Sequence, residues 1–340
     1  MVGISIQRYL SALKIHYVSR HPETPLNYAH PLGVIFLGLT LSNKIPYNKP
    51  YLSVDEQIEQ LKARNMLFVD KAFAKHYLSH LNYYRLTAYW LPYEENHATH
   101  RFKADITFEE VYKYYKFDRE LRVLILEAIE KIEVSIRTQM AYELSKKYGT
   151  HPQLKESIFH NIERYKKGLA TWVKEYNRSD ETYAKHFQKK YKETLPPIWV
   201  SVELMSLGQI SQWYSNIKQR QDRQAIAKKY DLDEKVLKSF LHHLTIIRNI
   251  CAHHSRLWNR KFRIDTLLAK RPTTLQSSFT GESEHKRNIF NTLVYIKYFL
   301  DIIEPEHGWD KKLKVLLKDI NIKAMGFPED WLEMPIWKDV

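Results

Sequence analysis

Apolar residues recur three and four positions apart along several stretches of this chain, a spacing typical of one buried face of an α-helix. The two clearest stretches cover residues 117–144 and 234–251. Their apolar positions are Leu121, Leu124, Ile125, Ala128, Ile132 and Ile136 in the first, and Leu237, Phe240, Leu244, Ile247 and Cys251 in the second. Nine glycines and thirteen prolines are few for 340 residues, which disfavours sheets joined by many tight turns. We therefore predict an all-α fold.

Weaker patterns predict further helices around these two. The segment Ser-Val-Asp-Glu at residues 53–56 has the form of a capping box, so a helix is expected to begin there. The apolar runs at 73–90, 286–303 and 309–320 have helical spacing as well.

Two segments interrupt the helical pattern. Residues 1–46 contain several prolines and no sustained period, and we expect an N-terminal extension there. Residues 145–195 are rich in Lys, His and Tyr and indicate an inserted connection. The predicted organisation is thus an extension followed by one helical domain over residues 47–340, with the connection inserted into it.

Composition and charge narrow the class of partner. The formal net charge of +14 favours polyanions such as nucleic acid. A single cysteine excludes an intramolecular disulfide and zinc sites built from several thiolates. The apolar stretch 31–41 is shorter than the roughly 20 residues that a membrane-spanning helix needs, and no secretory signal is recognisable. We therefore expect a cytoplasmic protein with no membrane partner.

The segment Arg-Asn-Ile-Cys-Ala-His at residues 248–253 lies at the end of the second long predicted helix and contains the candidate catalytic residues. RNA cleavage without a metal needs a base for the 2′-hydroxyl proton, an acid for the leaving 5′-oxygen and a cation for the phosphate. Imidazole titrates near neutral pH, and guanidinium stays charged and grips phosphate through two parallel hydrogen bonds. We therefore predict Arg248, Asn249 and His253 as catalytic residues, with no metal ligand and no cofactor.

The spacing alone is a weak signal, because sixteen histidines make about one Arg-to-His pair five positions apart expected by chance. The context strengthens it, since an asparagine follows the arginine and a basic run follows the motif. Together these residues outline an anion site. The predicted RNA-binding residues are His254, Arg256, Arg260, Lys261 and Arg263.

Helical geometry has a consequence for the number of chains. Five residues turn an α-helix by about 500°, which leaves Arg248 and His253 roughly 140° apart if the helix continues between them. Either the helix breaks between the two, or two copies of the motif grip one phosphate. No other arginine in the chain has a histidine five or six positions later. We therefore predict a homodimer with a composite site.

Several residues of the motif also have a structural interpretation. Arg248 could pair with a core carboxylate such as Glu133, and His253 could be an ordinary helix-terminal histidine. A zinc site at the paired histidines 242–243 and 253–254 is disfavoured, because adjacent histidines on a helix point about 100° apart and no His-Glu-x-x-His spacing is present. Cys251 is a candidate thiol nucleophile, but its place in the apolar pattern favours a small core residue.

Aromatic residues between 83 and 90 have two interpretations as well. They are candidates for stacking on bases, but an aromatic stripe at helical spacing is more often part of a core. The residues concerned are Tyr83, Tyr84, Tyr89 and Trp90.

Ordered motifs along residues 47–340 resemble those of the bacterial abortive-infection proteins of the AbiD and AbiF type, which belong to the HEPN group of helical ribonucleases. In sequence order they are Gln57-Ile58-Glu59-Gln60-Leu61, Asn82-Tyr83-Tyr84-Arg85-Leu86 with Tyr89-Trp90, Phe117-Asp118-Arg119-Glu120-Leu121-Arg122, Ile132-Glu133-Val134 with Arg137, Pro197-Ile198-Trp199, Arg248-Asn249 with His253, and Gly326-Phe327-Pro328 with Trp331. Residues 1–46 match nothing in that family.

The resemblance implies an HEPN-like helical bundle and metal-independent RNA cleavage through Arg248, Asn249 and His253. It also implies a dimeric site, products that end in a 2′,3′-cyclic phosphate, and a toxin-like role in defence against phage. A structured noncoding RNA is implied as a regulator. Two other functions remain as alternatives: a noncatalytic protein that binds structured RNA, and a DNA-directed regulator. The second is the weaker, because no helix-turn-helix with a short glycine-bearing turn is recognisable.

Overall fold

The structure is a computed structural model and describes residues 48–281 and 286–338. The chain divides into two units, Met1–Tyr51 and Leu52–Val340, and the helices of the described residues belong to the second. They are α2 (Val54–Ala63), α3 (Lys71–His80), α4 (Tyr83–Trp90), α5 (Phe108–Tyr148), α6 (Ile162–Arg178), α7 (Thr182–Lys190), α8 (Ile198–Ser201), α9 (Leu207–Asn216), α10 (Arg220–Lys228), α11 (Glu234–Ala252), α12 (Thr273–Gln276), α13 (Phe290–Ile303) and α14 (Trp309–Leu317). The predicted all-α fold is confirmed.

Smaller elements complete the described part of this unit. One antiparallel sheet is made of β1 (Glu94–Asn96) and β2 (Arg101–Phe102). The short 3-10 helices are η1 (Leu91–Tyr93), η2 (Pro152–Leu154), η3 (Glu156–Ile158), η4 (Val202–Leu204), η5 (Lys323–Met325) and η6 (Trp331–Glu333).

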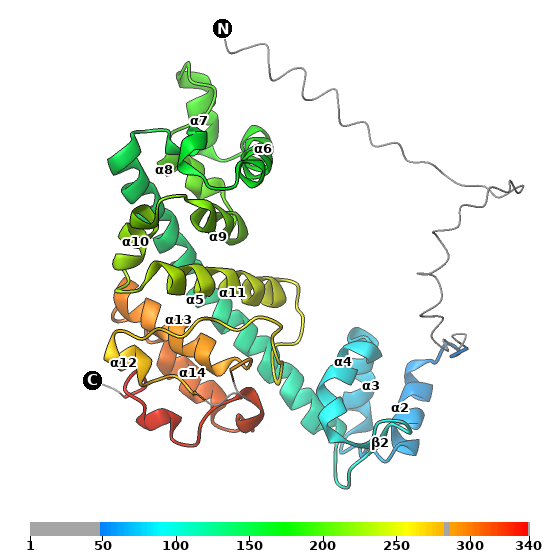
Figure 1. Cartoon of the computed structure of the whole chain (residues 1–340). Coiled ribbons are helices and arrows are strands. Elements are labelled where there is room, and N and C mark those ends of the chain that lie inside the picture. Colours follow the sequence, from blue (N-terminus) through cyan, green and yellow to red (C-terminus); the bar gives the residue numbers. More distant parts are fainter. Residues whose placement is uncertain (1–47, 282–285, 339–340) are drawn as a thin grey trace, which may run out of the picture. The chain divides into compact units, whose positions relative to one another are not determined.

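Helix α5 is the central element of the unit (Figure 1). Its 41 residues span about 60 Å at 1.5 Å per residue. Thr107 caps its first turn, and Gly149 ends it at φ 83° and ψ −161°, a conformation that glycine adopts without strain. Helices α4, α8, α9, α10, α11, α13 and α14 all pack against it. The motif-bearing helix α11 is therefore placed by its contact with α5.

Aromatic packing holds α11 against α13. The Phe240 ring of α11 lies 4.8 Å from the Tyr295 ring and 4.8 Å from the Phe299 ring of α13, measured between centroids. All three residues are fully buried. Burial of one apolar face thus fixes α11 along its length and leaves its opposite side free for polar residues.

The predicted helices agree with the structure to different degrees. Helix α11 matches the range 234–251 to within one residue, and α5 extends beyond 117–144 at both ends. The run 73–90 is two helices, because Leu81 is extended and the Asn82 side chain caps α4. Helix α13 begins at Phe290 and α14 ends at Leu317, so both are shorter than expected.

The segment 145–195, where an inserted connection is expected, contains two helices of its own. Helix α6 has 17 residues and α7 has nine. Tyr165, Trp172 and Tyr176 form the buried side of α6, which packs against α9. The polar composition of this segment reflects amphipathic helices with one buried face.

The sequence places two acid–base pairs four residues apart on α5, Glu127 with Lys131 and Glu133 with Arg137, and only the second pair forms. Glu133 pairs with Arg137 as the spacing indicates. Glu127 is instead bound by Lys312 of α14 at 2.7 Å, and Lys131 binds Glu304. Glu127 and Lys131 therefore each pair with a residue from another part of the chain and not with each other.

Residues 1–46, and with them the apolar stretch 31–41, lie outside the described residues. Within the described part, the search for a helix of sufficient length and apolarity to cross a membrane finds none.

Candidate functional site

The end of α11 is a tight turn that includes His253, and Arg248 and Asn249 lie in the last helical turn before it. The His254 N–H donates to the Cys251 carbonyl at 3.1 Å, and the Ser255 N–H donates to the Ile250 carbonyl at 3.0 Å. These two bonds define a Schellman motif, whose left-handed position is usually glycine. His254 occupies that position at φ 55°. A side chain there costs about 1–2 kcal/mol, and strained backbone of this kind is concentrated at functional sites.

Arg248, Asn249 and His253 lie at this helix end with little internal engagement. Arg248 is partly exposed, and Asn249 and His253 are exposed. The Arg248 Nη1 atom donates to Asn249 Oδ1 at 3.4 Å, and the Asn249 carbonyl accepts the His253 N–H at 3.0 Å. In the described ranges neither Arg248 nor His253 forms an ion pair. Asn249 therefore contacts both neighbours, and the cation and the imidazole are available to a ligand.

The helix does not break between Arg248 and His253. The bond from the His253 N–H to the Asn249 carbonyl is the ordinary helical bond four residues back, and the left-handed turn comes one residue later. The two side chains therefore leave α11 about 140° apart, and one chain does not present them on one face. The structure therefore does not show a helix break between Arg248 and His253, which is one of the two arrangements that the spacing allows.

Arg248 lines a groove of about 270 Å³ between α11 and α5. Glu133 and Arg137 of α5 line the same groove, but they bind each other. Arg137 also donates to the Met205 carbonyl. A structural pair between Arg248 and Glu133 does not form, because Arg137 already neutralises that carboxylate.

A buried carboxylate on α5 holds the loop that follows the motif. Asp118 is fully buried, and its Oδ1 atom accepts the backbone N–H groups of Leu257 at 2.9 Å and Trp258 at 2.6 Å. Its Oδ2 atom accepts the Tyr89 hydroxyl at 2.6 Å and the Arg122 guanidinium. Burial raises the pKa of the Asp118 carboxyl, and Arg122 with the other donors opposes that rise.

Arg85 of α4 lies against the same turn. Its Nη1 atom donates to the His254 carbonyl at 2.7 Å, so a cation sits at the C-terminal end of α11, where the helix dipole favours positive charge. Arg85 and Asp118 belong to the motifs that carry the family resemblance, but their positions in the sequence do not place them at the site. The available signal for Asp118 was an acid on the apolar face of α5, four residues before Arg122 and three before Leu121.

The predicted RNA-binding residues divide into two groups. Arg256 donates to the Ala88 carbonyl at 2.9 Å, and Arg260 donates to the Arg256 carbonyl at 3.0 Å, so both have structural contacts in the loop. His254, Lys261 and Arg263 are exposed. The structure thus brings the basic run next to the motif, with three of its five residues exposed.

Two residues near the motif have clear structural roles. His243 is buried between the Ile264 carbonyl, 2.9 Å from Nδ1, and the Thr292 hydroxyl, 2.8 Å from Nε2. Burial lowers the pKa of His243 to about 4, so it is neutral, and a carbonyl partner requires the proton on Nδ1. Cys251 is buried, and burial raises its pKa to about 12, which makes it a protonated core residue. In the described ranges the search for three or more metal-ligating side chains placed together finds none.

The aromatic stripe of α4 is mostly core. Tyr89 and Trp90 are buried, and Tyr83 is half-buried with its hydroxyl bound by Arg64 at 2.9 Å. Tyr84 is 61% exposed beside Arg85. One of the four rings is therefore mostly exposed to solvent near the turn.

Comparison with known proteins assigns the family. The model of the Abi-like protein family matches residues 76–259, which is more than half of the chain and includes α4, α5, the α11 motif and the Asp118-bound loop. No curated protein and no solved structure matches the chain. On the strength of the family match, the chain belongs to the Abi-like proteins, a family of abortive-infection proteins.

Proposed function

We propose that this protein is a metal-independent endoribonuclease that acts in abortive infection, with Arg248, Asn249 and His253 as its catalytic residues. The observation that carries the proposal is the exposure of the motif: at one helix end lie an imidazole that is exposed and a guanidinium that has no ion-pair partner among the described residues. Structural arginines and histidines at a buried interface are normally engaged by protein partners, and the neighbouring Arg137 and His243 are engaged in that way.

In this mechanism, side chains of the protein supply every group that the reaction needs. The ribose 2′-oxygen forms a bond to the adjacent phosphorus while the bond from phosphorus to the 5′-oxygen breaks. The 2′-hydroxyl loses its proton, the leaving 5′-oxygen gains one, and the products carry a 2′,3′-cyclic phosphate and a 5′-hydroxyl. His253 exchanges these protons, and Arg248 binds the phosphate and stabilises its developing charge. Asn249 orients Arg248 through the contact at 3.4 Å.

A second copy of the chain completes the site in this proposal. Because Arg248 and His253 leave α11 about 140° apart, the phosphate is gripped by Arg248 of one protomer and His253 of the other. Val123 and Val134, two exposed apolar side chains on α5, lie on the helix that forms one wall of the Arg248 groove. Burial of such residues in a symmetric contact favours a homodimer.

The decisive measurement is product analysis on purified protein. Arg248→Ala and His253→Ala are each expected to abolish cleavage of single-stranded RNA in the presence of EDTA, with an unchanged helical circular-dichroism signal. His242→Ala on the exposed side of the same helix is the matched control and is expected to keep full activity. Cyclic-phosphate ends are expected from the parent and from the His242→Ala control, and from neither Arg248→Ala nor His253→Ala. Binding of structured RNA without new ends in any protein would replace the proposal by the noncatalytic alternative.

A mixing experiment tests the composite site directly. The two inactive variants are co-refolded in equal amounts, so that about half of the dimers are heterodimers. In each heterodimer one site pairs the intact Arg248 of one chain with the intact His253 of the other. Activity should then recover to about a quarter of the parent value, since one site of two is whole in half of the dimers. A site built within one chain gives no recovery.

Two further parts of the proposal concern the cell. Cleavage of RNA in an infected cell accounts for the abortive-infection role of the family, and a structured noncoding RNA is proposed as the regulator that restrains the enzyme. Sequencing of RNA that copurifies with the Arg248→Ala protein is expected to recover substrate and regulator together, and recovery of DNA alone would contradict both.

A further inference from the structure

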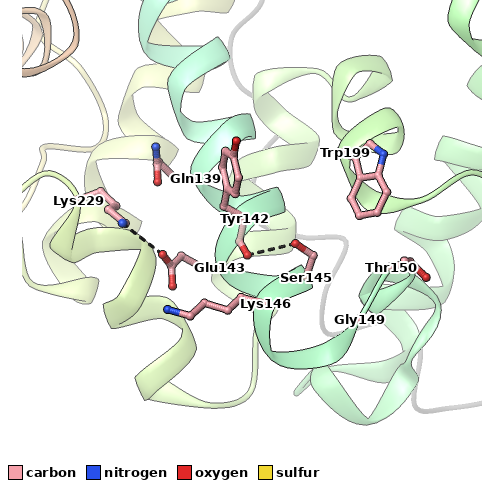
Figure 2. Close-up of a pocket in the computed structure, with 9 residues that line it drawn as sticks. All are labelled: Gln139, Tyr142, Glu143, Ser145, Lys146, Gly149, Thr150, Trp199 and Lys229. Atoms are coloured by element: carbon pink, nitrogen blue, oxygen red, sulfur yellow. Dashed lines mark hydrogen bonds and ion pairs between the residues drawn. The ribbon is translucent and has the colours of Figure 1, made fainter.

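A second concave surface lies where α5 ends (Figure 2). The groove has a volume of about 660 Å³ and is lined by the last turns of α5, by α8 and by Lys229 after α10. Tyr142 of α5 and Trp199 of α8 project into it and are 67% and 50% exposed. This volume falls in the range of about 300–1,000 Å³ that is usual for small-ligand sites.

Trp199 is exceptional among the tryptophans of this chain. The other seven of the eight are at most 7% exposed. Indole has a large apolar surface, so burial inside the protein is strongly favourable. A half-exposed tryptophan that lines a groove beside an exposed tyrosine therefore indicates a surface that a partner covers.

Hydrogen bonds hold the backbone around Trp199, whereas its indole ring is half-exposed. The Ile198 N–H donates to the Thr150 carbonyl at 2.9 Å, which ties α8 to the turn after α5. The Ser201 hydroxyl donates to the Pro197 carbonyl at 3.0 Å, and the buried Trp172 indole donates to the Ser201 carbonyl at 3.0 Å. Within the described residues the Trp199 and Tyr142 rings make no ring contact. Two stacking surfaces are thus preorganised at little entropic cost on binding.

Positive charge accompanies the two rings. Lys146 follows Tyr142 by one helical turn, is exposed, and has no ion-pair partner in the described part of the chain. Lys229 also lines the groove and lies 3.4 Å from Glu143. These lysines offset the negative end of the α5 dipole. Aromatic faces beside cations fit unpaired nucleotides, whose bases stack and whose phosphates need counter-charge, whereas an apolar peptide leaves Lys146 without a partner.

We propose that this groove is a subsite for single-stranded RNA, in which a base stacks on Trp199 and Tyr142 while the flanking phosphates contact Lys146 and Lys229. The inference rests on the proposed function for the identity of the ligand. The subsite is separate from the Arg248 groove: the two share no lining residue, and Glu133 of that groove lies about 20 Å along α5 from Lys146 of this one. It holds an unpaired stretch of substrate remote from the scissile bond and gives the enzyme a preference for long unpaired RNA.

The test measures RNA binding in the full-length protein with His253→Ala, which does not cleave. Its ligands are a short single-stranded RNA and the same strand with abasic sugars in place of its bases. Trp199→Ala and Tyr142→Ala are each expected to weaken binding of the base-bearing strand about tenfold, because one stacking surface is lost. Binding of the abasic strand should be unchanged by either substitution. Tyr191→Ala, at a tyrosine that is 47% exposed outside the groove, is the matched control.

Two further measurements locate the contact. Lys146→Gln should lower the slope of log affinity against log salt concentration by about one, whereas Lys311→Gln at an exposed lysine of α14 should not. Photocrosslinking with 5-iodouridine RNA should attach the strand to Trp199 or Tyr142, as mapped by mass spectrometry. The crosslink uses unsubstituted aromatic residues, so it tests the subsite even if a variant fails to fold.

The two proposals fail separately. Equal affinity of parent, Trp199→Ala and Tyr142→Ala for the base-bearing strand, or crosslinks confined to other parts of the chain, would overturn the subsite whether or not the enzyme cleaves RNA. If RNA binding depends on Trp199 but the parent protein yields no cyclic-phosphate ends, the subsite is supported and the endoribonuclease proposal is overturned.

Discussion

The Asp118 carboxylate on α5 accepts the backbone N–H of Trp258, five residues after His253, at 2.6 Å. Two elements that are 140 residues apart in sequence are thereby joined beside the motif. The position of the turn that carries His253 and His254 therefore depends on a buried acid far from it in the chain.

Removal of this acid is expected to affect both folding and activity. Asp118→Ala leaves the Arg122 charge buried without its partner, and we expect a loss of about 3–5 kcal/mol in the free energy of unfolding, measured by urea denaturation. RNA cleavage should fall with it, because the loop after the motif loses two hydrogen bonds. Asp118→Asn keeps one carbonyl oxygen as an acceptor and should lose less stability. In a folded Asp118→Asn protein, rapid exchange of the Leu257 and Trp258 N–H groups with solvent, together with an unchanged cleavage rate, would argue against a positioning role for Asp118.

His254 allows stability and binding to be separated at one position. His254→Gly removes the Cβ strain of the left-handed conformation and should raise the free energy of unfolding by about 1 kcal/mol. If the imidazole contacts RNA, the same variant binds RNA more weakly, so the two properties move in opposite directions. His254→Ala keeps the strain and should not be stabilised. Thermal melting and RNA titration on the three proteins give the result, and a destabilised glycine variant would contradict the strain.

Arg85 is expected to matter for cleavage more than for folding. It is exposed, so Arg85→Ala should change the free energy of unfolding by less than about 1 kcal/mol. Loss of a cation bound to the His254 carbonyl at 2.7 Å should reduce kcat/KM for RNA about tenfold. Arg101→Ala, at an exposed arginine of β2, serves as the control. Equal kinetics in the two variants would remove Arg85 from the site.

Acid should destabilise the fold through His243. Its pKa is about 4 in the folded protein, below its ordinary value near 6.5, so the unfolded chain binds the proton first as pH falls. Stability from the neutral histidine is full above about pH 6.5 and is lost progressively towards about pH 4, by roughly 3 kcal/mol in total. His243→Gln should flatten this part of the pH profile of the free energy of unfolding. His242→Gln on the exposed side should leave the profile as it is, and an identical profile in both variants would exclude His243 as the cause.

Cys251 should be chemically silent in the folded protein. Burial and a pKa of about 12 keep the thiol protonated, so iodoacetamide should label it only after denaturation. Cys251→Ala is expected to retain RNA cleavage and to lose about 1 kcal/mol of stability from the small cavity. Mass spectrometry of alkylated protein, native and unfolded, gives the answer. Rapid labelling of the native protein, together with loss of activity in Cys251→Ala, would instead indicate that Cys251 is a nucleophile.

The sequence by itself was sufficient for the all-α class, the α11 boundaries and the α2 cap, because these depend on local spacing and on hydrogen bonds within a few residues. The sequence also marks Arg248, Asn249 and His253 as candidate site residues, and helical geometry shows that a continuous helix separates the Arg248 guanidinium from the His253 imidazole by about 140°. The interpretation of Cys251 as a small core residue followed from its place on the apolar face, since burial is periodic along a helix.

Tertiary structure decided everything that joins distant segments. Whether α11 breaks before or after His253 depended on a Schellman turn around a histidine, which residue type does not indicate. The partners of Glu127 and Lys131, the Asp118 bond to Trp258 and the Arg85 contact all depend on how helices pack against α5. The pairing of Tyr142 with Trp199 in one groove has the same origin. Spacing specifies which side of a helix a residue occupies, but only packing decides what lies opposite it.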